Sequence, residues 1–220
     1  LKVLSGKHGT QLFLMADSLL NPVVDDLSRT IIDNQLSLYW DGYLRADPGA
    51  CNTDNTFKWR QGGFYRARLG LESGSPKILK EMDKKITPQQ IKDAVGSLAM
   101  AGIKTTTYWV IGYPGETEED FQQTLDLIAD MKDDLYETDC NPFIYFLSGQ
   151  VESDNWAKGK SHSLLYTEET RDLLMMQNWI LDTLPSREET FKRVNRFVQH
   201  CRDLGIPNPY SLREIHNADE

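Results

Sequence analysis

The stretch KTTTYWVIGYPGETEEDF, residues 104–121, contains a strand, a turn and the start of a helix in direct succession. Residues 104–111 are rich in β-branched and aromatic side chains, which is typical of a strand. The glycines and proline of residues 112–115 predict a tight turn, and Thr117 is a favourable helix N-cap. The apolar face of the following helix consists of Phe121, Leu125, Ile128 and Met131. The stretch therefore predicts one complete strand–turn–helix unit.

The same order of elements recurs on both sides of this unit. Strands are predicted near residues 11–16, 35–45, 65–71 and 139–147, and helices begin near Asn21, Asp54 and Thr87. Five strands separated by helices predict parallel pairing with right-handed crossovers. Polar or Gly-rich residues follow each strand, at the edge where parallel α/β folds bind ligands. Two architectures fit this pattern: an open doubly wound sheet, and part of a βα barrel.

The pattern changes after the fifth strand. Residues 148–166 predict a long loop, and two helices follow at residues 167–184 and 186–204, with Pro185 between them. We therefore expect two parts. Residues 1–149 form the α/β part, and residues 150–220 form a loop with a C-terminal helical extension.

Composition excludes several classes of protein. The chain has 220 residues, of which 40% are hydrophobic and 26% charged, which is ordinary for a globular protein. It has no apolar run of transmembrane length, so we expect no membrane partner. Its net charge is −9, and residues 116–139 alone contain ten carboxylates and one base. Such an acidic surface opposes a phosphate backbone, so nucleic acid is not the expected partner.

The three cysteines are too dispersed to form a metal knuckle or a redox dithiol. Cys51, Cys140 and Cys201 lie far apart in the sequence, and the four histidines do not cluster either. An odd number of scattered cysteines indicates reduced thiols in a cytoplasmic protein. No metal-ligand set is predicted within the chain.

Polar side chains at the strand ends suit a zwitterionic ligand that carries a ribose. Asp17 and Glu72 suit an amine or hydroxyl groups, and Arg45 suits a carboxylate. A second interpretation of Glu72 is equally open, in which Glu72 and Ser75 only cap the helix that begins near Pro76. The turn at residues 112–117 lacks both a phosphate-binding lysine motif and a dinucleotide-binding glycine motif.

The order of these motifs resembles the radical S-adenosylmethionine (radical SAM) enzyme family. The matching segments are residues 13–18, 45–47, 69–75, 101–103 and 112–121. The resemblance is strongest to the class whose barrel follows a cobalamin-binding domain, which includes the anaerobic magnesium-protoporphyrin IX monomethyl ester oxidative cyclase. It implies an α/β fold, a partial (βα)6 TIM-like barrel of parallel strands. Residues 1–149 would be its second to sixth βα units.

The resemblance also implies which residues contact S-adenosylmethionine. Asp17 and Ser18 would lie near its amino group, and Arg45 near its carboxylate. The remaining contacts would be Glu72 and Ser73 with the ribose or the amino acid part, Val110, Ile111 and Gly112 with the adenine, and Tyr145 and Phe146 on the far side. Glu116 is offset by one position from the family's motif, and we interpret it as a turn residue.

In this family a [4Fe–4S] cluster, held by a cysteine triad, reduces S-adenosylmethionine and starts radical C–H chemistry. This chain contains no such triad, so we expect the cluster ligands, and any cobalamin-binding domain, outside these residues. The chain would begin within the helix after the cluster loop and be inactive alone. The full-length enzyme would be of the radical SAM oxidoreductase or methyltransferase type. It would carry out methyl transfer or oxidative cyclisation on a small-molecule substrate.

Two other functions fit the fold. One is a conventional βα-barrel lyase, although Lys104 begins its strand, where it is badly placed for a Schiff base. The other is a non-catalytic scaffold domain.

Overall fold

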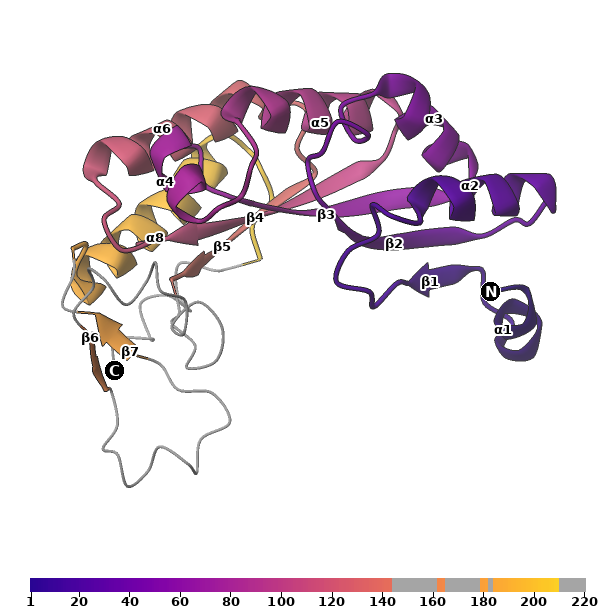
Figure 1. The fold of residues 1–220 in the computed structure, drawn as a ribbon, viewed down its shortest axis with the longest axis horizontal. Coiled ribbons are helices and arrows are strands. Elements are labelled where there is room, and N and C mark those ends of the chain that lie inside the picture. Colours follow the sequence, from indigo (N-terminus) through magenta and orange to yellow (C-terminus); the bar gives the residue numbers. More distant parts are fainter. Residues whose placement is uncertain (144–161, 165–178, 182–183, 210–220) are drawn as a thin grey trace.

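The computed structural model describes residues 1–143, 162–164, 179–181 and 184–209. Its main feature is a parallel sheet whose strands follow chain order, namely β1 (Leu12–Leu14), β2 (Tyr39–Leu44), β3 (Phe64–Glu72), β4 (Lys104–Ile111) and β5 (Glu137–Pro142). The order does not reverse, as it would in a doubly wound sheet. The sheet curls into a half-barrel (Figure 1), which confirms the predicted partial TIM-like barrel.

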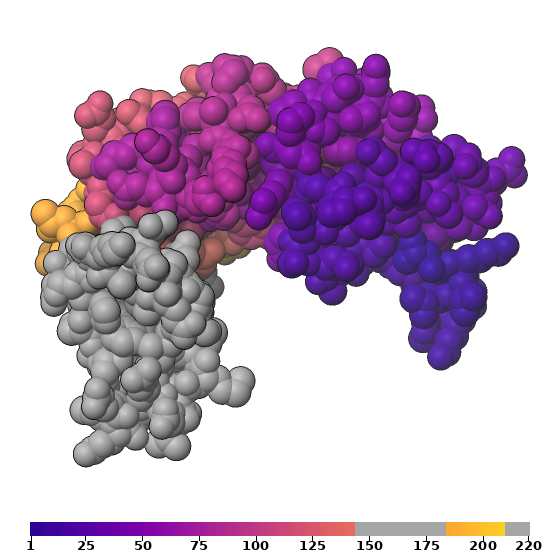
Figure 2. Space-filling view, in the orientation of Figure 1, coloured from indigo at the N-terminus to yellow at the C-terminus, as the bar shows by residue number. Residues whose placement is uncertain are grey.

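The crossover helices lie together on the convex face of this sheet (Figure 1). They are α2 (Val24–Asp33), α3 (Thr53–Gln61), α4 (Pro76–Glu81), α5 (Pro88–Met100) and α6 (Glu118–Asp130). Each connection between neighbouring parallel strands is right-handed, which places every helix on the same side. In the space-filling view the indigo N-terminal segment, the magenta middle and the coral segment lie side by side in chain order (Figure 2). The short helix α1 (Lys2–His8) lies beside β1 at the N-terminal end.

The last helix, α8 (Arg187–Asp203), lies beside α6 and packs on β5. Its buried residues include Val194, Phe197, Val198 and Cys201. The chain after α8 is held against β5, because the Thr138 N–H donates to the Pro207 carbonyl (2.9 Å). Helix α8 therefore starts at the carboxyl ends of the strands and runs back toward their amino ends. This confirms the predicted helix near residues 186–204.

The prediction of a helix at residues 167–184 is wrong in the part of that segment that the structure describes. Strand β7 (Trp179–Leu181) pairs with the antiparallel strand β6 (His162–Leu164). Aromatic and β-branched residues at positions 179 and 180 favour a strand once a partner strand is available. Strand β6 also falls inside the expected loop, and the rest of both segments lies outside the described residues.

The two faces of the sheet differ in polarity because side chains alternate along each strand. In β3, Ala67, Leu69 and Leu71 are fully buried under the helices. The alternate residues Arg66 and Arg68 are only partly buried, on the concave face. Here Arg68 pairs with Asp41 on β2 (2.8 Å), and Arg66 pairs with Glu137 on β5. The concave face is thus a polar surface bridged by ion pairs across strands.

Aromatic packing anchors the helix layer on the first strands. Trp40 and Phe64 stack at 4.3 Å, and Trp59 meets Phe64 edge to face. Both indole N–H groups are satisfied, because Trp40 donates to the Gly62 carbonyl (2.8 Å) and Trp59 donates to Asp25 (2.5 Å). Such buried aromatic clusters contribute strongly to the stability of a core.

The first crossover helix begins later than the sequence predicts, at Val24 and not near Asn21. Asn21 does not cap α2, which begins at Val24 without a side-chain cap. The Asn21 amide instead accepts from the Arg45 N–H (2.8 Å) and donates to the Arg45 carbonyl (3.2 Å). The side chain thus satisfies both backbone groups of Arg45, just past the end of β2, and joins segments 24 residues apart.

Candidate functional site

The polar turns that follow β3 and β4 meet at the carboxyl edge of the sheet. Residues 72–75 lead from β3 into α4, and residues 112–117 lead from β4 into α6. This is the edge at which parallel α/β folds bind ligands. Of the residues expected to bind a ligand, Glu72, Ser73, Val110, Ile111 and Gly112 all belong to this edge.

Glu72 ends β3 in a left-handed backbone conformation, with a φ of 67°. Its carboxylate accepts a hydrogen bond from the Lys84 ammonium at 2.5 Å, and its side chain is 18% exposed. A Cβ atom at Gly70 would lie 3.0 Å from the same carboxylate, so glycine leaves room for it. The cap of α4 is Ser75, whose Oγ accepts from the Ile78 N–H (3.4 Å). Glu72 therefore forms part of a charged pair at the strand end and does not cap the helix.

Ser73 and Gly74 join the β3 turn to helix α6. Ser73 is completely buried, and its hydroxyl lies 3.4 Å from the Thr124 hydroxyl. The Gly74 N–H donates to Thr124 Oγ1 (2.9 Å). A Cβ at Gly74 would lie 2.6 Å from the backbone of α6, so only glycine permits this close approach. In this structure the Ser73 side chain supports the turn from behind.

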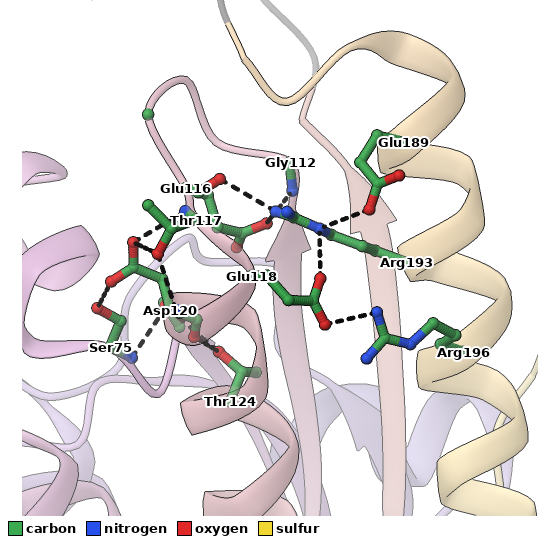
Figure 3. A network of polar contacts seen from close by, with 12 residues as sticks. Ser75, Gly112, Glu116, Thr117, Glu118, Asp120, Thr124, Glu189, Arg193 and Arg196 are labelled. Carbon is green, nitrogen blue, oxygen red and sulfur yellow. Dashed lines mark hydrogen bonds and ion pairs between the residues drawn. The ribbon is translucent and has the colours of Figure 1, made fainter.

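Asp120 connects the starts of α4 and α6 (Figure 3). Its carboxylate accepts hydrogen bonds from Ser75 Oγ (2.6 Å) and from the Thr117 N–H (2.9 Å) and hydroxyl (2.8 Å). Lys77 Nζ donates a further hydrogen bond to it (2.7 Å). Burial acts to raise the pKa of Asp120, but hydrogen bonds from Lys77, Ser75 and Thr117 outweigh it and hold the pKa well below its usual range. The two turns are thus held in a fixed relation by one ionised side chain.

Two glycines shape the turn after β4. Gly112 and Gly115 both have positive φ angles, 81° and 91°. The Gly112 N–H donates to Glu116 Oε2 (2.9 Å), so the glutamate closes the turn on itself. Glu116 was expected to be an ordinary turn residue, yet its side chain is only 1% exposed. Burial raises the pKa of Glu116, and the hydrogen bonds from Gly112 and Arg193 oppose that rise.

The expected contacts differ in how exposed they are, and two of them lie outside the described residues. Asp17 and Ser18 follow β1 and are exposed, as is Arg45 after β2. Val110 is partly buried, whereas Ile111 is fully buried. Tyr145 and Phe146 lie outside the described residues.

Sequence reasoning missed three basic residues of this edge, Lys77, Lys84 and Arg193. Each makes a charged contact with an acidic residue of the turns or of α6. No local motif marks them, because their partners are between 12 and 77 positions away in the sequence. The one available signal was the lack of local partners for Glu72 and Glu116.

The cysteines do not form an iron–sulfur site. Cys51 precedes α3, Cys140 lies on β5 and Cys201 on α8, and the last two are fully buried. Burial raises the pKa of Cys201 to about 12 and that of Cys140 well above its usual value, so neither favours the thiolate that a cluster needs. Within the described residues, no three His, Cys, Asp or Glu side chains are grouped to hold a metal ion. The chain's own cysteines therefore do not fit a cluster.

The fold defines a partial βα barrel whose carboxyl edge is formed by these two turns. Comparison with known families assigns it further: the model of the radical SAM superfamily matches residues 14–128, which include the last residue of β1, strands β2 to β4, both turns and most of α6. The chain belongs to the radical SAM superfamily. The family predicted from the sequence motifs is confirmed.

Individual relatives agree with this assignment. An uncharacterized methyltransferase of Pyrococcus horikoshii is 33% identical over 100 residues, which are 46% of this chain and 21% of the relative. The tRNA-2-methylthio-N(6)-dimethylallyladenosine synthase of Natranaerobius thermophilus is 43% identical over 68 residues, 30% of this chain and 15% of the relative. The chain thus corresponds to about a fifth or less of the length of these proteins.

A solved structure shares the fold. The radical S-adenosylmethionine methyltransferase TsrM of Kitasatospora setae, with cobalamin and a [4Fe–4S] cluster bound, superposes with a TM-score of 0.54. Its sequence is 19% identical, and the match covers 64% of this chain and 29% of TsrM.

Proposed function

We propose that this chain provides the S-adenosylmethionine-binding and substrate-binding part of a radical SAM enzyme that carries out methyl transfer or oxidative cyclisation. One observation carries the proposal: the residues that match the radical SAM family include both turns of the carboxyl edge, at residues 72–75 and 112–117. The methyltransferase and methylthiolation relatives support group transfer as the reaction class.

The groups at this edge have the chemistry that S-adenosylmethionine requires. The Glu72 carboxylate accepts hydrogen bonds from ribose hydroxyls or an ammonium, and the exposed Arg45 guanidinium binds a carboxylate. The adenine would lie against the strand backbone at the end of β4, on the face away from Thr190, because Thr190 fills the space where a side chain of Gly112 would be. Asp17, Ser18, Val110, Tyr145 and Phe146 complete the proposed set, whereas the fully buried Ser73 and Ile111 would support it from behind.

Bound at this edge, S-adenosylmethionine would supply the radical chemistry of the family once reduced by a [4Fe–4S] cluster. We assign the cluster ligands to residues outside these 220, since Cys51, Cys140 and Cys201 are separated and largely buried. By themselves these residues then hold no cluster and perform no turnover. A stable, reducible cubane after reconstitution of this chain with iron and sulfide would contradict this part. Cobalamin, if the enzyme uses it, would bind a separate domain, as the class resemblance implies.

We propose a small molecule as the substrate. The exposed side of α6 is acidic, which opposes the approach of a phosphate backbone. None of the helices in the described part of the chain has the length and apolar character needed to span a bilayer. Tight, salt-dependent binding of tRNA to the protein would overturn the choice of a small molecule, and the relative that modifies tRNA makes this measurement necessary.

The conventional lyase has less support. Lys104 begins β4, at the end of the sheet opposite the two turns, and its ammonium lies over the Tyr136 ring at 4.3 Å. A Schiff-base lysine needs a desolvated site beside the substrate.

Calorimetric titration with two ligands tests the proposal. S-adenosylmethionine probes the whole site, and 5′-methylthioadenosine probes its adenosine part without the amino acid. Glu72→Gln should weaken both by about tenfold, the effect of losing one charge-assisted hydrogen bond. Asp83→Asn is the matched control, because Asp83 is an exposed acid that pairs with Lys85 at 3.6 Å. Absence of binding by the unmodified protein would refute cofactor binding and leave the scaffold function.

A further inference from the structure

Helix α8 reaches the β4 turn from a part of the chain beyond the residues that the family model matches. Thr190 and Arg193 are three positions apart, on one face of the helix, and both contact the turn at residues 112–117. Figure 3 shows the Arg193 side chain extending from α8 toward Gly112 and Glu116. The sheet edge is therefore in contact with an element distant in sequence.

Gly112 is held from two sides. On one side its N–H donates to Glu116 Oε2 (2.9 Å). On the other side Thr190 lies so close that a Cβ at Gly112 would be 2.2 Å from its Oγ1 and 2.4 Å from its Cγ2. The positive φ of Gly112, 81°, is kept between these two contacts. The end of β4 thus has its conformation specified by Glu116 and α8 together.

Glu116 in turn depends on Arg193. One Arg193 nitrogen, Nη1, donates to Glu116 Oε2 (3.0 Å) and to the Glu116 carbonyl (3.1 Å). Both side chains are buried, 1% exposed for Glu116 and 6% for Arg193. Without Arg193, Glu116 would be an uncompensated carboxylate in a buried site. It would then take up a proton or turn away, and either change alters the acceptor of the Gly112 N–H.

Arg193 has acidic partners besides Glu116. Glu116, in contrast, has Arg193 as the only cation within ion-pair distance among the described residues. The Arg193 Nε lies 3.5 Å from Glu118 at the start of α6 and 3.4 Å from Glu189 one turn earlier on α8. These carboxylates hold the guanidinium in place between the two helices. A cavity of about 400 Å³ adjoins the pair, which leaves space for a different side chain at position 193.

We propose that Arg193 is a positioning residue of the S-adenosylmethionine site. Through Glu116 it holds the Gly112 backbone in the conformation that the adenine contacts, so α8 sets the affinity for the cofactor. A binding surface that is already in its bound conformation pays less conformational entropy on binding. This inference rests on the proposed function, because it assigns the adenine to the end of β4.

The first test measures the dissociation constants of S-adenosylmethionine and 5′-methylthioadenosine for Arg193→Met. We expect both to weaken by tenfold or more. Arg196→Met is the matched control, since Arg196 lies on the same helix and pairs with Glu118 (2.6 Å) without reaching Glu116. It should stay within about twofold of the unmodified protein. Equal affinities for Arg193→Met and the unmodified protein would overturn the inference.

A rescue experiment separates positioning from simple helix packing. In the double variant Glu116→Gln/Arg193→Met the buried carboxylate is gone, and the amide oxygen still accepts from the Gly112 N–H. We expect it to regain most of the affinity that Arg193→Met loses. If Arg193 only packed α8 on the sheet, the two losses would add, and that outcome would overturn the inference.

Hydrogen exchange at the Gly112 amide, without ligand, distinguishes failure of this inference from failure of the proposed function. Arg193→Met should speed this exchange by tenfold or more, and Arg196→Met should leave it unchanged. If the unmodified protein binds neither ligand, the proposed function fails, and the cofactor role of Arg193 fails with it. The exchange rate of the Gly112 amide would still show whether Arg193 fixes the conformation of the turn. Unchanged exchange would refute the positioning role whether or not the protein binds S-adenosylmethionine.

Discussion

Replacement of Gly112 by alanine is expected to destabilise the protein through two separable effects. A non-glycine residue at a φ of 81° costs about 1–2 kcal/mol in backbone energy. The new Cβ would also lie 2.2 Å from Thr190 Oγ1, and overpacking of this kind costs about 1–3 kcal/mol. Together, Gly112→Ala should lower the free energy of unfolding by about 2–5 kcal/mol.

Gly115→Ala is the matched control for the backbone effect. Gly115 has a similar φ of 91°, but the nearest atom to its added Cβ is Glu81 Oε2 at 3.7 Å, an ordinary contact. It should therefore lose only about 1–2 kcal/mol. The difference between the two variants measures the contact with Thr190.

Urea unfolding followed by circular dichroism, with Tm as a second measure, would give both values. For a chain of this size, 1 kcal/mol corresponds to about 2–4 °C in Tm. Thr190→Gly removes all three atoms near the new Cβ, so in the double variant with Gly112→Ala we expect a favourable coupling energy of about 1–3 kcal/mol. Equal stability of the two alanine variants, or no coupling with Thr190→Gly, would refute the close packing of α8 on the turn.

Three further predictions concern stability and thiol chemistry. Asp120→Asn should cost about 2–4 kcal/mol in urea unfolding, because four hydrogen bonds to a buried carboxylate are lost or weakened. Since folding lowers the pKa of Asp120, its contribution to the free energy of unfolding is present above the unfolded pKa of about 3.9 and is lost as pH falls below it. A variant whose stability falls as steeply in acid as that of the unmodified protein would contradict this. At pH 8 a thiol reagent should modify only Cys51 in the folded protein and all three cysteines after unfolding, because burial raises the pKa of Cys201 to about 12 and that of Cys140 well above its usual value; rapid reaction of three thiols in the folded state would be the contrary result. Gly96→Ala should raise stability by about 0.5–1 kcal/mol, since Gly96 is inside α5 and its added Cβ meets only Asp134 Oδ2, at 3.8 Å; a fall in Tm would show that the site has less space.

Much of the fold was predictable because its signals are local. The helix expected near Thr87 and the N-cap expected at Thr117 are both present, and each threonine accepts a hydrogen bond from the backbone N–H three positions later. Alternating strand and helix patterns predicted the parallel sheet, and its order follows from short right-handed connections. The prediction failed at residues 179–181, where a three-residue strand depends on a distant partner strand.

The sites were less predictable because their contacts are made through space. Glu72 stood out in the sequence as a polar residue after a strand, but its partner Lys84 did not. The sequence indicates only a turn residue at Glu116, since nothing near it in the chain points to its ion pair with Arg193, 77 positions later. Ser73 was expected to face a ligand, and in the structure its hydroxyl lies against α6.

The sequence by itself determined the family, the order of the βα units and the polar turns at the carboxyl edge of the sheet, because each depends on residues a few positions apart. The tertiary structure decided which charges meet there, which glycines have no room for a side chain, and that α8 contacts the turn after β4. Those properties depend on distances of a few ångströms between segments far apart in the chain, and such distances exist only once the chain has folded.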